Sequence, residues 1–370
     1  MKEHMKKITA VTVLVFMGIL MFTAFFGESR TDGSEGFPDI TLSSLYNGSC
    51  VENLQKYSSE YFPFRDTMMP LKSKINSIIG ESIVNGVYID DERMLDAEMS
   101  SRVITMDAAS QLNSFSNLYD GTVYLAAVPT SSGVYGEKLP SYLLENSESQ
   151  QISSFYEMLS GNIRKIDAYN ILKMLNDNYI YFRSDTKWTS YGAYCVYRTV
   201  IQKLGFLPTP YDKYTIRHVT DEFRGNLYER TMYADIKTDL LDIYEYNGGA
   251  EAVSCTAYDN SGNGSSIELY DMSKLNSKYK YDMYLGSEAP VIEIESSVGN
   301  MKKLLVIKDS YADCFIPFLL QHYNRITVAS PEYMDKSLEN YININDYEQI
   351  LILFGIENIN NKKLFANISK

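Results

Sequence analysis

The chain has 370 residues, 45% hydrophobic and 22% charged, which is enough for one large domain or two modest ones. Its formal net charge of -13 excludes an obvious nucleic-acid role, because binding phosphates needs a basic surface. The four cysteines form no Cys-x-x-Cys pair and have no histidines clustered near them, so we expect no zinc site and no cofactor. Their wide spacing favours mostly free, buried thiols over two disulfides.

The N-terminal part reads as a targeting or anchoring segment. Residues 1–7 carry three lysines, and residues 8–26 form an uncharged apolar run of about the length that crosses a bilayer as a helix. A cleaved signal peptide is the competing interpretation. We expect residues 1–7 in the cytoplasm, a single-pass anchor at 8–26, a polar linker at 27–36 and an extracellular domain at 37–370.

The rest of the chain alternates between helical and strand-like patterns. Helices are predicted at residues 51–61, 68–79, 99–119, 151–159, 190–204, 311–322 and 334–341. Strands are predicted at residues 122–128, 162–167, 281–285, 303–307, 325–328 and 349–354. Residues 206–280 are rich in tyrosine and irregular, with short strands and loops. The alternation predicts a mostly parallel sheet covered on both faces, with a site at the carboxyl ends of its strands.

Ser310 directly follows one of these strand ends, in the sequence Lys308-Asp309-Ser310. A serine at a strand-to-helix turn is lifted above the sheet, where backbone N–H groups can stabilise an oxyanion. The simpler interpretation is that Asp309 or Ser310 caps the following helix.

The segment Asp185-Thr186-Lys187-Trp188 holds the single tryptophan of the chain. A serine nucleophile needs a base, normally a histidine oriented by a carboxylate, but here lysine stands two residues after the aspartate. Asp185 favours the charged ammonium of Lys187, so the two residues resemble a structural ion pair more than a base and its orienting acid. They could equally be loop charges before a capped helix.

Several motifs together resemble the DHHW family of bacterial surface proteins and the related SGNH-hydrolase-like proteins of alginate O-acetylation. The motifs are Tyr181-Phe182-Arg183, Asp185 to Gly192, Phe62 to Asp66, Asn85 to Tyr88, Glu137 to Pro140, Phe223-x-Gly225 and Val306 to Ala312. The resemblance implies a three-layer α/β SGNH-like domain. It also implies ester chemistry on a cell-envelope polysaccharide, typically acetyl transfer beside a membrane-bound O-acyltransferase.

Carried over residue by residue, the resemblance implies Ser310 as nucleophile and Asp185 as orienting acid, with Lys187 in the position of the base histidine. The oxyanion segment falls at Gly286 and Glu288, where a carboxylate replaces the expected asparagine. Further candidates for the oxyanion or substrate contact are Trp188 and Tyr311.

Three functions fit these observations. The first is a membrane-anchored acetyltransferase or acetylesterase, degenerate or weakly active because its base and its oxyanion asparagine are replaced. The second is a non-catalytic protein that binds a glycan or docks an acyltransferase through the cleft that holds the catalytic site in active relatives, with Trp188 stacking on sugar rings. The third is a surface protein whose role lies in the tyrosine-rich segment 206–280.

Overall fold

The structure is a computed structural model of the chain, and it describes residues 65–78, 82–98, 106–143, 147–286 and 288–368, together with Val15. The chain divides into two units. The described part of the first unit contains helix α4 (Arg65–Ile78), close to the helix expected at 68–79. The second unit holds the central sheet and every candidate site residue.

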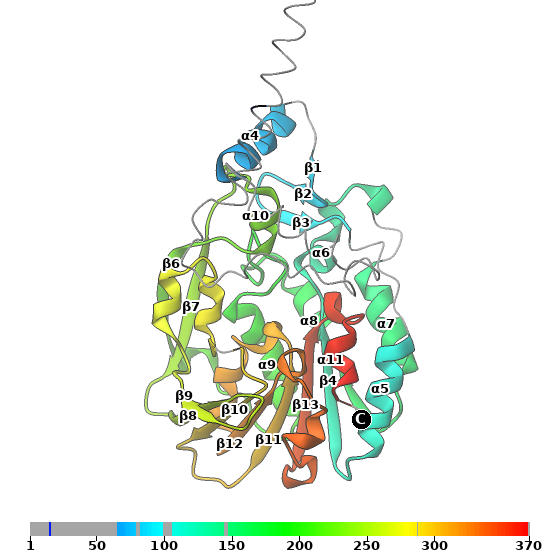
Figure 1. The fold of residues 1–370 in the computed structure, drawn as a ribbon, viewed down its shortest axis with the longest axis vertical. Coiled ribbons are helices and arrows are strands. Elements are labelled where there is room, and N and C mark those ends of the chain that lie inside the picture. The colour runs from blue at the N-terminus through cyan, green and yellow to red at the C-terminus, as the bar shows by residue number, and fades with distance from the viewer. Residues whose placement is uncertain are drawn as a thin grey trace, which may run out of the picture. The chain divides into compact units, whose positions relative to one another are not determined.

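The second unit is built on an eight-stranded sheet with the order β5-β4-β13-β11-β12-β10-β8-β9 (Figure 1). The strands are β4 (Thr122–Val128), β5 (Ile163–Ile166), β8 (Ala252–Tyr258), β9 (Gly264–Ser266), β10 (Val291–Ser296), β11 (Lys303–Lys308), β12 (Arg325–Ala329) and β13 (Gln349–Gly355). The pairs from β5 to β12 are parallel. The pairs from β12 to β9 are antiparallel.

The sheet is therefore mixed, and the expectation of a mostly parallel sheet is wrong. The antiparallel part comes from the segment that the sequence left irregular and from β10, which the sequence analysis missed. Only residues 297–302 join β10 to β11, whereas a parallel crossover needs about a dozen residues or more. The chain must consequently enter β11 from the end where β10 stops.

Helices cover both faces of the sheet (Figure 1). One face packs against α8 (Ala168–Met174), α9 (Ser190–Lys203) and the antiparallel pair β6 (Tyr214–Phe223) and β7 (Asp239–Tyr246). The other face packs against α5 (Met106–Asn117), α7 (Glu148–Met158) and α11 (Lys362–Ala366). The alternating side chains of β4, β11, β12 and β13 are buried on both faces, which explains their nearly continuous apolar sequences.

Smaller elements complete the second unit. A three-stranded antiparallel sheet is formed by β1 (Ile83–Val84), β2 (Val87–Ile89) and β3 (Met94–Asp96). Its first turn has positive φ at Asn85 and Gly86, as the Asn-Gly pair indicates. The remaining short helices are α6 (Ser131–Val134), α10 (Asn226–Thr231), η2 (Gly136–Lys138), η3 (Ser141–Leu143), η4 (Tyr211–Lys213), η5 (Met272–Asn276), η6 (Lys280–Met283), η7 (Ser310–Ala312), η8 (Ile316–Gln321), η9 (Pro331–Tyr333), η10 (Leu338–Asn340), η11 (Ile344–Asp346) and η12 (Ile356–Asn358).

Three predicted elements differ from the observed ones. Residues 281–285 form no strand, because their first part belongs to the 3₁₀ helix η6. The helix expected at 311–322 is two 3₁₀ pieces, η7 and η8, separated before Pro317, which cannot donate a backbone hydrogen bond to a continuous helix. The helix expected at 334–341 is reduced to η10.

The expected membrane anchor also needs correction. Among the described residues, no helix has the length and apolar character that crossing a bilayer requires, which contradicts the predicted single-pass membrane location. The run at residues 8–26 lies outside the described part of the chain except for Val15, as do the expected linker at 27–36 and the expected helix at 51–61.

Candidate functional site

The two informative sequence segments meet in space. Trp188 Nε1 donates a hydrogen bond of 2.8 Å to the carbonyl of Tyr311. The Tyr311 hydroxyl in turn donates to the carbonyl of Thr186 at 3.1 Å. The Trp188 ring also stacks on Phe315 with an interplanar angle of 12°. These contacts fix the loop before α9 against the turn after β11.

Ser310 lies at the carboxyl end of β11, as the first residue of η7, and its side chain is partly exposed. The cap of this turn is Asp309, whose Oδ1 accepts a hydrogen bond from Tyr311 N at 2.9 Å. Asp309 Oδ2 accepts two more, at 2.8 Å each, from Gly355 N and Asn358 Nδ2. The sequence predicted a helix cap at Asp309 or Ser310, and the structure shows that the cap is Asp309. The Ser310 hydroxyl is therefore not used as a cap.

Ser310 is held from the other side by Tyr281. The Tyr281 hydroxyl donates a hydrogen bond of 3.2 Å to the Ser310 carbonyl. Within the part of the chain that the structure describes, no side chain forms a hydrogen bond with Ser310 Oγ. The turn is fixed, but within the described residues the hydroxyl has no hydrogen-bonded base.

Lys187, the residue at the histidine position, lies in a largely buried ion pair. Its side chain is 16% exposed, and Nζ is 3.7 Å from Asp185 Oδ1. The ammonium also lies 5.4 Å from the ring centre of Tyr281 and 6.0 Å from that of Tyr311. Both rings present a favourable face to a cation.

The charges around Lys187 keep it protonated. Burial lowers the pKa of Lys187, but the carboxylates of Asp185, Glu357, Asp309 and Asp313 outweigh burial and raise the pKa above its ordinary value. A group with a raised lysine pKa cannot accept a proton from serine at neutral pH. Lys187 is therefore a fixed positive charge in this site.

Asp185 is buried and is oriented by the backbone as well as by Lys187. Its Oδ1 accepts a hydrogen bond from Lys187 N at 2.9 Å, and its Oδ2 accepts one from Asn226 N at 2.8 Å. A Cβ added to Gly225 would lie 2.2 Å from Asp185 Oδ2, so only glycine leaves room for the carboxylate. This contact accounts for the glycine of the Phe223-x-Gly225 motif.

The oxyanion candidates lie on a tight turn. Gly286 has φ +33, and a Cβ there would meet the carbonyl of Asp282 at 2.8 Å. Glu288 is exposed, and Ser287 lies outside the described residues. Asp282 interacts electrostatically with both Glu288 and Lys187, so the turn shares the field of the lysine. No hydrogen bond joins Gly286 or Glu288 to Ser310 among the described residues.

The aromatic candidates have structural positions. Trp188 and Tyr311 have no exposed surface. A ring buried on both faces cannot stack on a sugar, so the structure gives no support to Trp188 as a substrate platform. Both residues instead hold the two segments together.

Sequence reasoning missed Tyr281, Asp313 and Glu357. Glu357 follows the carboxyl end of β13, next to β11, and its Oε1 accepts a hydrogen bond of 3.1 Å from Thr186 Oγ1. The rule that sites form at strand ends could have found it. Asp313 pairs with Lys308, and Tyr281 was assigned to a strand, so neither had a clear sequence signal.

The cysteines and the side chains that could bind a metal were also considered in the sequence. Cys195, Cys255 and Cys314 are free thiols, and Cys50 lies outside the described residues. Within the described ranges, no group of three or more His, Cys, Asp or Glu side chains is placed to hold a metal ion.

Comparison with known proteins adds two kinds of relatives. The chain is 27% identical over 198 residues to a protein of Azotobacter vinelandii described as probable alginate O-acetylase AlgJ, covering 48% of this chain and 49% of that protein. The chain thus spans about half the length of that curated relative.

Two solved structures have a similar fold. A DHHW family protein from Eubacterium siraeum matches with a TM-score of 0.64 and 21% identity, over 77% of this chain and 96% of that one. Bacillus cereus PatB1, solved with a sulfonyl adduct, matches with a TM-score of 0.62 and 20% identity, over 75% of this chain and 97% of that one. The model of the DHHW protein family matches residues 73–329, more than half of the chain, and the chain therefore belongs to the DHHW family.

Proposed function

We propose that this protein takes part in O-acetylation of a polysaccharide, and that its Ser310 site is a degenerate or weakly active acetyltransferase or esterase site. The similarity to a probable alginate O-acetylase supports the reaction class. The fold is shared with PatB1, which was solved with a sulfonyl adduct.

The observation that carries the proposal is the state of Lys187. Its Nζ is 3.7 Å from Asp185 Oδ1, and it forms no hydrogen bond with Ser310 Oγ among the described residues. Surrounding carboxylates oppose the effect of burial and raise the pKa of Lys187. The acid that would orient a histidine is thus occupied by a cation that cannot act as a base.

The chemistry follows from this arrangement. When Ser310 Oγ attacks an acetyl ester, it forms a bond to the acetyl carbon, and the bond from that carbon to the sugar oxygen breaks. The sugar oxygen takes up a proton as it leaves, and the serine must give its own proton to another group. Without a base, that proton goes to water or hydroxide, and the contribution of general base catalysis, about 10²- to 10⁴-fold, is lost. The carboxylate of Glu288, if it faces the developing oxyanion, adds repulsion.

Restoration of the missing groups tests the proposal. We expect wild type to hydrolyse p-nitrophenyl acetate at nearly the rate of Ser310→Ala. The variant carrying Lys187→His and Glu288→Asn should gain a Ser310-dependent rate of about 10²-fold or more, because a histidine next to Asp185 can accept the serine proton. The triple variant with Ser310→Ala is the matched control and should lose that gain.

Two results would overturn parts of the proposal. Rapid hydrolysis by wild type that disappears in Ser310→Ala would contradict a degenerate site. If the variant with Lys187→His and Glu288→Asn folded normally but hydrolysed the ester no faster than wild type, the turn at Ser310 would not be a degenerate catalytic site. That result would favour a purely non-catalytic role.

A further inference from the structure

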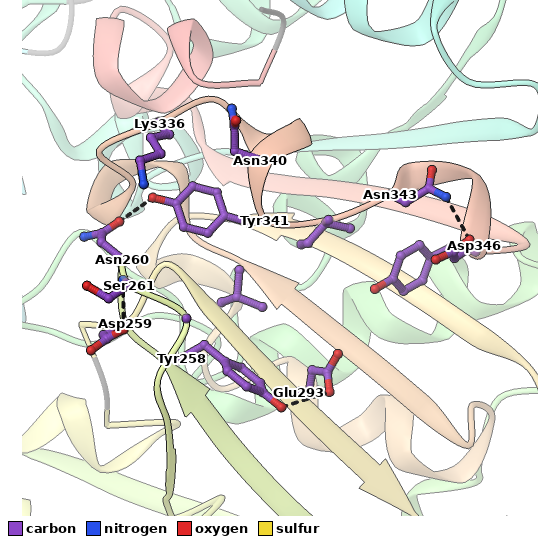
Figure 2. A pocket seen from close by; sticks show the side chains of 14 residues that line it. Tyr258, Asp259, Asn260, Ser261, Glu293, Lys336, Asn340, Tyr341, Asn343 and Asp346 are labelled. Carbon is purple, nitrogen blue, oxygen red and sulfur yellow. Dashed lines mark hydrogen bonds between the residues drawn. The ribbon is translucent and has the colours of Figure 1, made fainter.

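A groove of 520 Å³, whose lining does not include Ser310, lies between the turn after β8 and the segment 336–347 (Figure 2). Its floor includes Val291 and Ile342, which belong to the core on the sheet face covered by α5, α7 and α11. Ligand sites for small molecules typically occupy about 300–1,000 Å³. The groove has room for a ligand of one or a few ring units.

The rims of the groove carry three partly exposed tyrosines, Tyr258, Tyr341 and Tyr347. Figure 2 shows Tyr341 and Lys336 on one rim and Tyr258 with Glu293 on the other. A tyrosine ring offers an apolar face and a hydroxyl, which suits the apolar C–H face and the hydroxyl groups of a sugar ring.

Hydrogen bonds fix this rim before any ligand arrives. The Tyr341 hydroxyl lies 2.5 Å from both Asn260 Oδ1 and Asp335 Oδ1, and Asn260 Nδ2 donates to the carbonyl of Tyr333 at 3.0 Å. The Tyr347 hydroxyl donates to Thr327 Oγ1 at 2.9 Å. Because these side chains are already ordered, a ligand would lose little affinity to ordering them.

The polar lining is negative in balance. Asp259, Glu293 and Asp346 contribute three carboxylates, and Lys336 contributes one ammonium group. The charge of Glu293 is the largest influence on Tyr258, and it raises the pKa of that hydroxyl. A uronate or a phosphate would meet like charge here, and like charges brought together across an interface oppose binding.

We propose that this groove binds sugar units that carry no negative charge, either neutral sugars or amino sugars, as a second contact for the polysaccharide. The inference rests on the proposed function, because that function is the reason to expect a glycan. It also distinguishes the ligand from a polyuronate such as the alginate named for the Azotobacter vinelandii relative. The tyrosine rims supply stacking, and Glu293 and Asp346 accept hydrogen bonds from hydroxyl or ammonium groups.

Calorimetric titration with three defined oligosaccharides tests the inference. The probes are a glucose tetramer, a glucosamine tetramer and a mannuronate tetramer, which are neutral, cationic and anionic. We expect wild type to bind the first two, with the glucosamine tetramer weakened by salt, and to show no binding of the mannuronate tetramer. The inference would be overturned if wild type bound neither the glucose tetramer nor the glucosamine tetramer. It would also be overturned if wild type bound the mannuronate tetramer more tightly than both.

Variants identify the groove as the binding site. Tyr258→Ala and Glu293→Gln should each weaken binding at least tenfold, whereas Tyr142→Ala, which removes an exposed tyrosine outside the groove, should leave it unchanged. Glu293→Lys should lose the glucosamine tetramer and gain the mannuronate tetramer, an outcome that partial unfolding cannot produce. Unchanged binding in all of the groove variants would place the sugar elsewhere.

The test is independent of catalysis. Ser310→Ala should bind the same sugars as wild type, because Ser310 is not part of the groove. If the restored Lys187→His, Glu288→Asn variant shows no esterase activity while the sugars still bind, the proposed reaction fails and the binding site stands.

Discussion

Trp188 Nε1 donates a hydrogen bond of 2.8 Å to the carbonyl of Tyr311, across 123 positions of sequence. Neither residue has exposed surface. The bond ties the loop that carries Asp185 and Lys187 to the turn that carries Ser310, so the site geometry depends on it. The tryptophan that marks the motif in the sequence is thus part of the support of the site and lies out of reach of a ligand.

The fluorescence of this single tryptophan gives the first prediction. Trp188 should emit at short wavelength and resist quenching by acrylamide, because its ring is buried on both sides. Adding the sugars that bind the groove should leave the emission unchanged. A shift of the emission maximum on addition of a sugar, with saturation, would show that Trp188 contacts the ligand after all.

Gly225 provides a test of how tightly Asp185 is held. Gly225→Ala should destabilise the protein by about 1–3 kcal/mol, the usual cost of overpacking, because the new Cβ would lie 2.2 Å from Asp185 Oδ2. Gly161→Ala is the matched control, since nothing lies within 4 Å of a Cβ at that position. Urea unfolding of the two variants measures the difference. Equal stability of both would mean that Asp185 is free to move.

The ion pair between Asp185 and Lys187 should be asymmetric in its contribution to stability. Lys187→Met should cost about 3–5 kcal/mol, because it leaves the carboxylates around Lys187, Asp185 among them, without their shared cation. Asp185→Asn should cost less, about 1–3 kcal/mol, because it removes one acceptor of a backbone N–H group but leaves Lys187 with the other carboxylates.

The double variant completes the cycle, and unfolding free energies should give a coupling of about 1–3 kcal/mol between the two side chains. A smaller cost for Lys187→Met than for Asp185→Asn would contradict the view that Lys187 is held by several carboxylates.

His322 should make stability fall on mild acidification. Burial lowers its pKa from 6.5 to about 4, and Nε2 lies 2.6 Å from the Tyr197 hydroxyl. Below about pH 6.5 the unfolded chain binds a proton at His322 that the folded chain binds only near pH 4. The stability that the neutral, buried His322 contributes is therefore fully present above about pH 6.5 and is lost as the pH falls from about 6.5 to about 4.

The variant His322→Phe cannot titrate. The advantage of wild type over this variant at pH 7.5 should therefore shrink by about 3 kcal/mol at pH 4, since one unit of pKa shift corresponds to about 1.4 kcal/mol. Denaturant unfolding at several pH values measures this difference. Parallel stability curves for the two proteins would show that His322 is not the group responsible.

The sequence predicted the regular parts of the fold better than the irregular ones. After their first residue, the runs 122–128 and 349–354 are apolar because they are buried on both faces, and they agree with β4 and β13 to within one residue. The helix expected at 190–204 agrees with α9, and the structure shows that Thr189 caps it, since Thr189 Oγ1 accepts a hydrogen bond from Gly192 N. By contrast, β10 alternates Glu293 and Glu295 with apolar residues and was missed.

The candidate site was only partly predictable. The residues that match family motifs, Asp185, Lys187 and Ser310, could be named from the sequence, and the ion pair of the first two was expected. The carboxylates that fix the charge of Lys187 come from distant strand ends, and only the register of β11 against β13 brings Glu357 near it. The pairing of β11 with β13 cannot be read from the local sequence around Lys187 or Glu357.

The central claim is that Ser310 has no base because Lys187 is a fixed cation. Its most direct test is the rate at which phenylmethanesulfonyl fluoride modifies Ser310, measured by mass spectrometry of the Ser310 peptide across pH. Wild type should react slowly, at a rate that follows hydroxide without inflection between about pH 6 and 9, and Lys187→Met should behave the same. Rapid modification with an inflection in that range, abolished by Lys187→Met, would show that Lys187 is the base and would contradict this account.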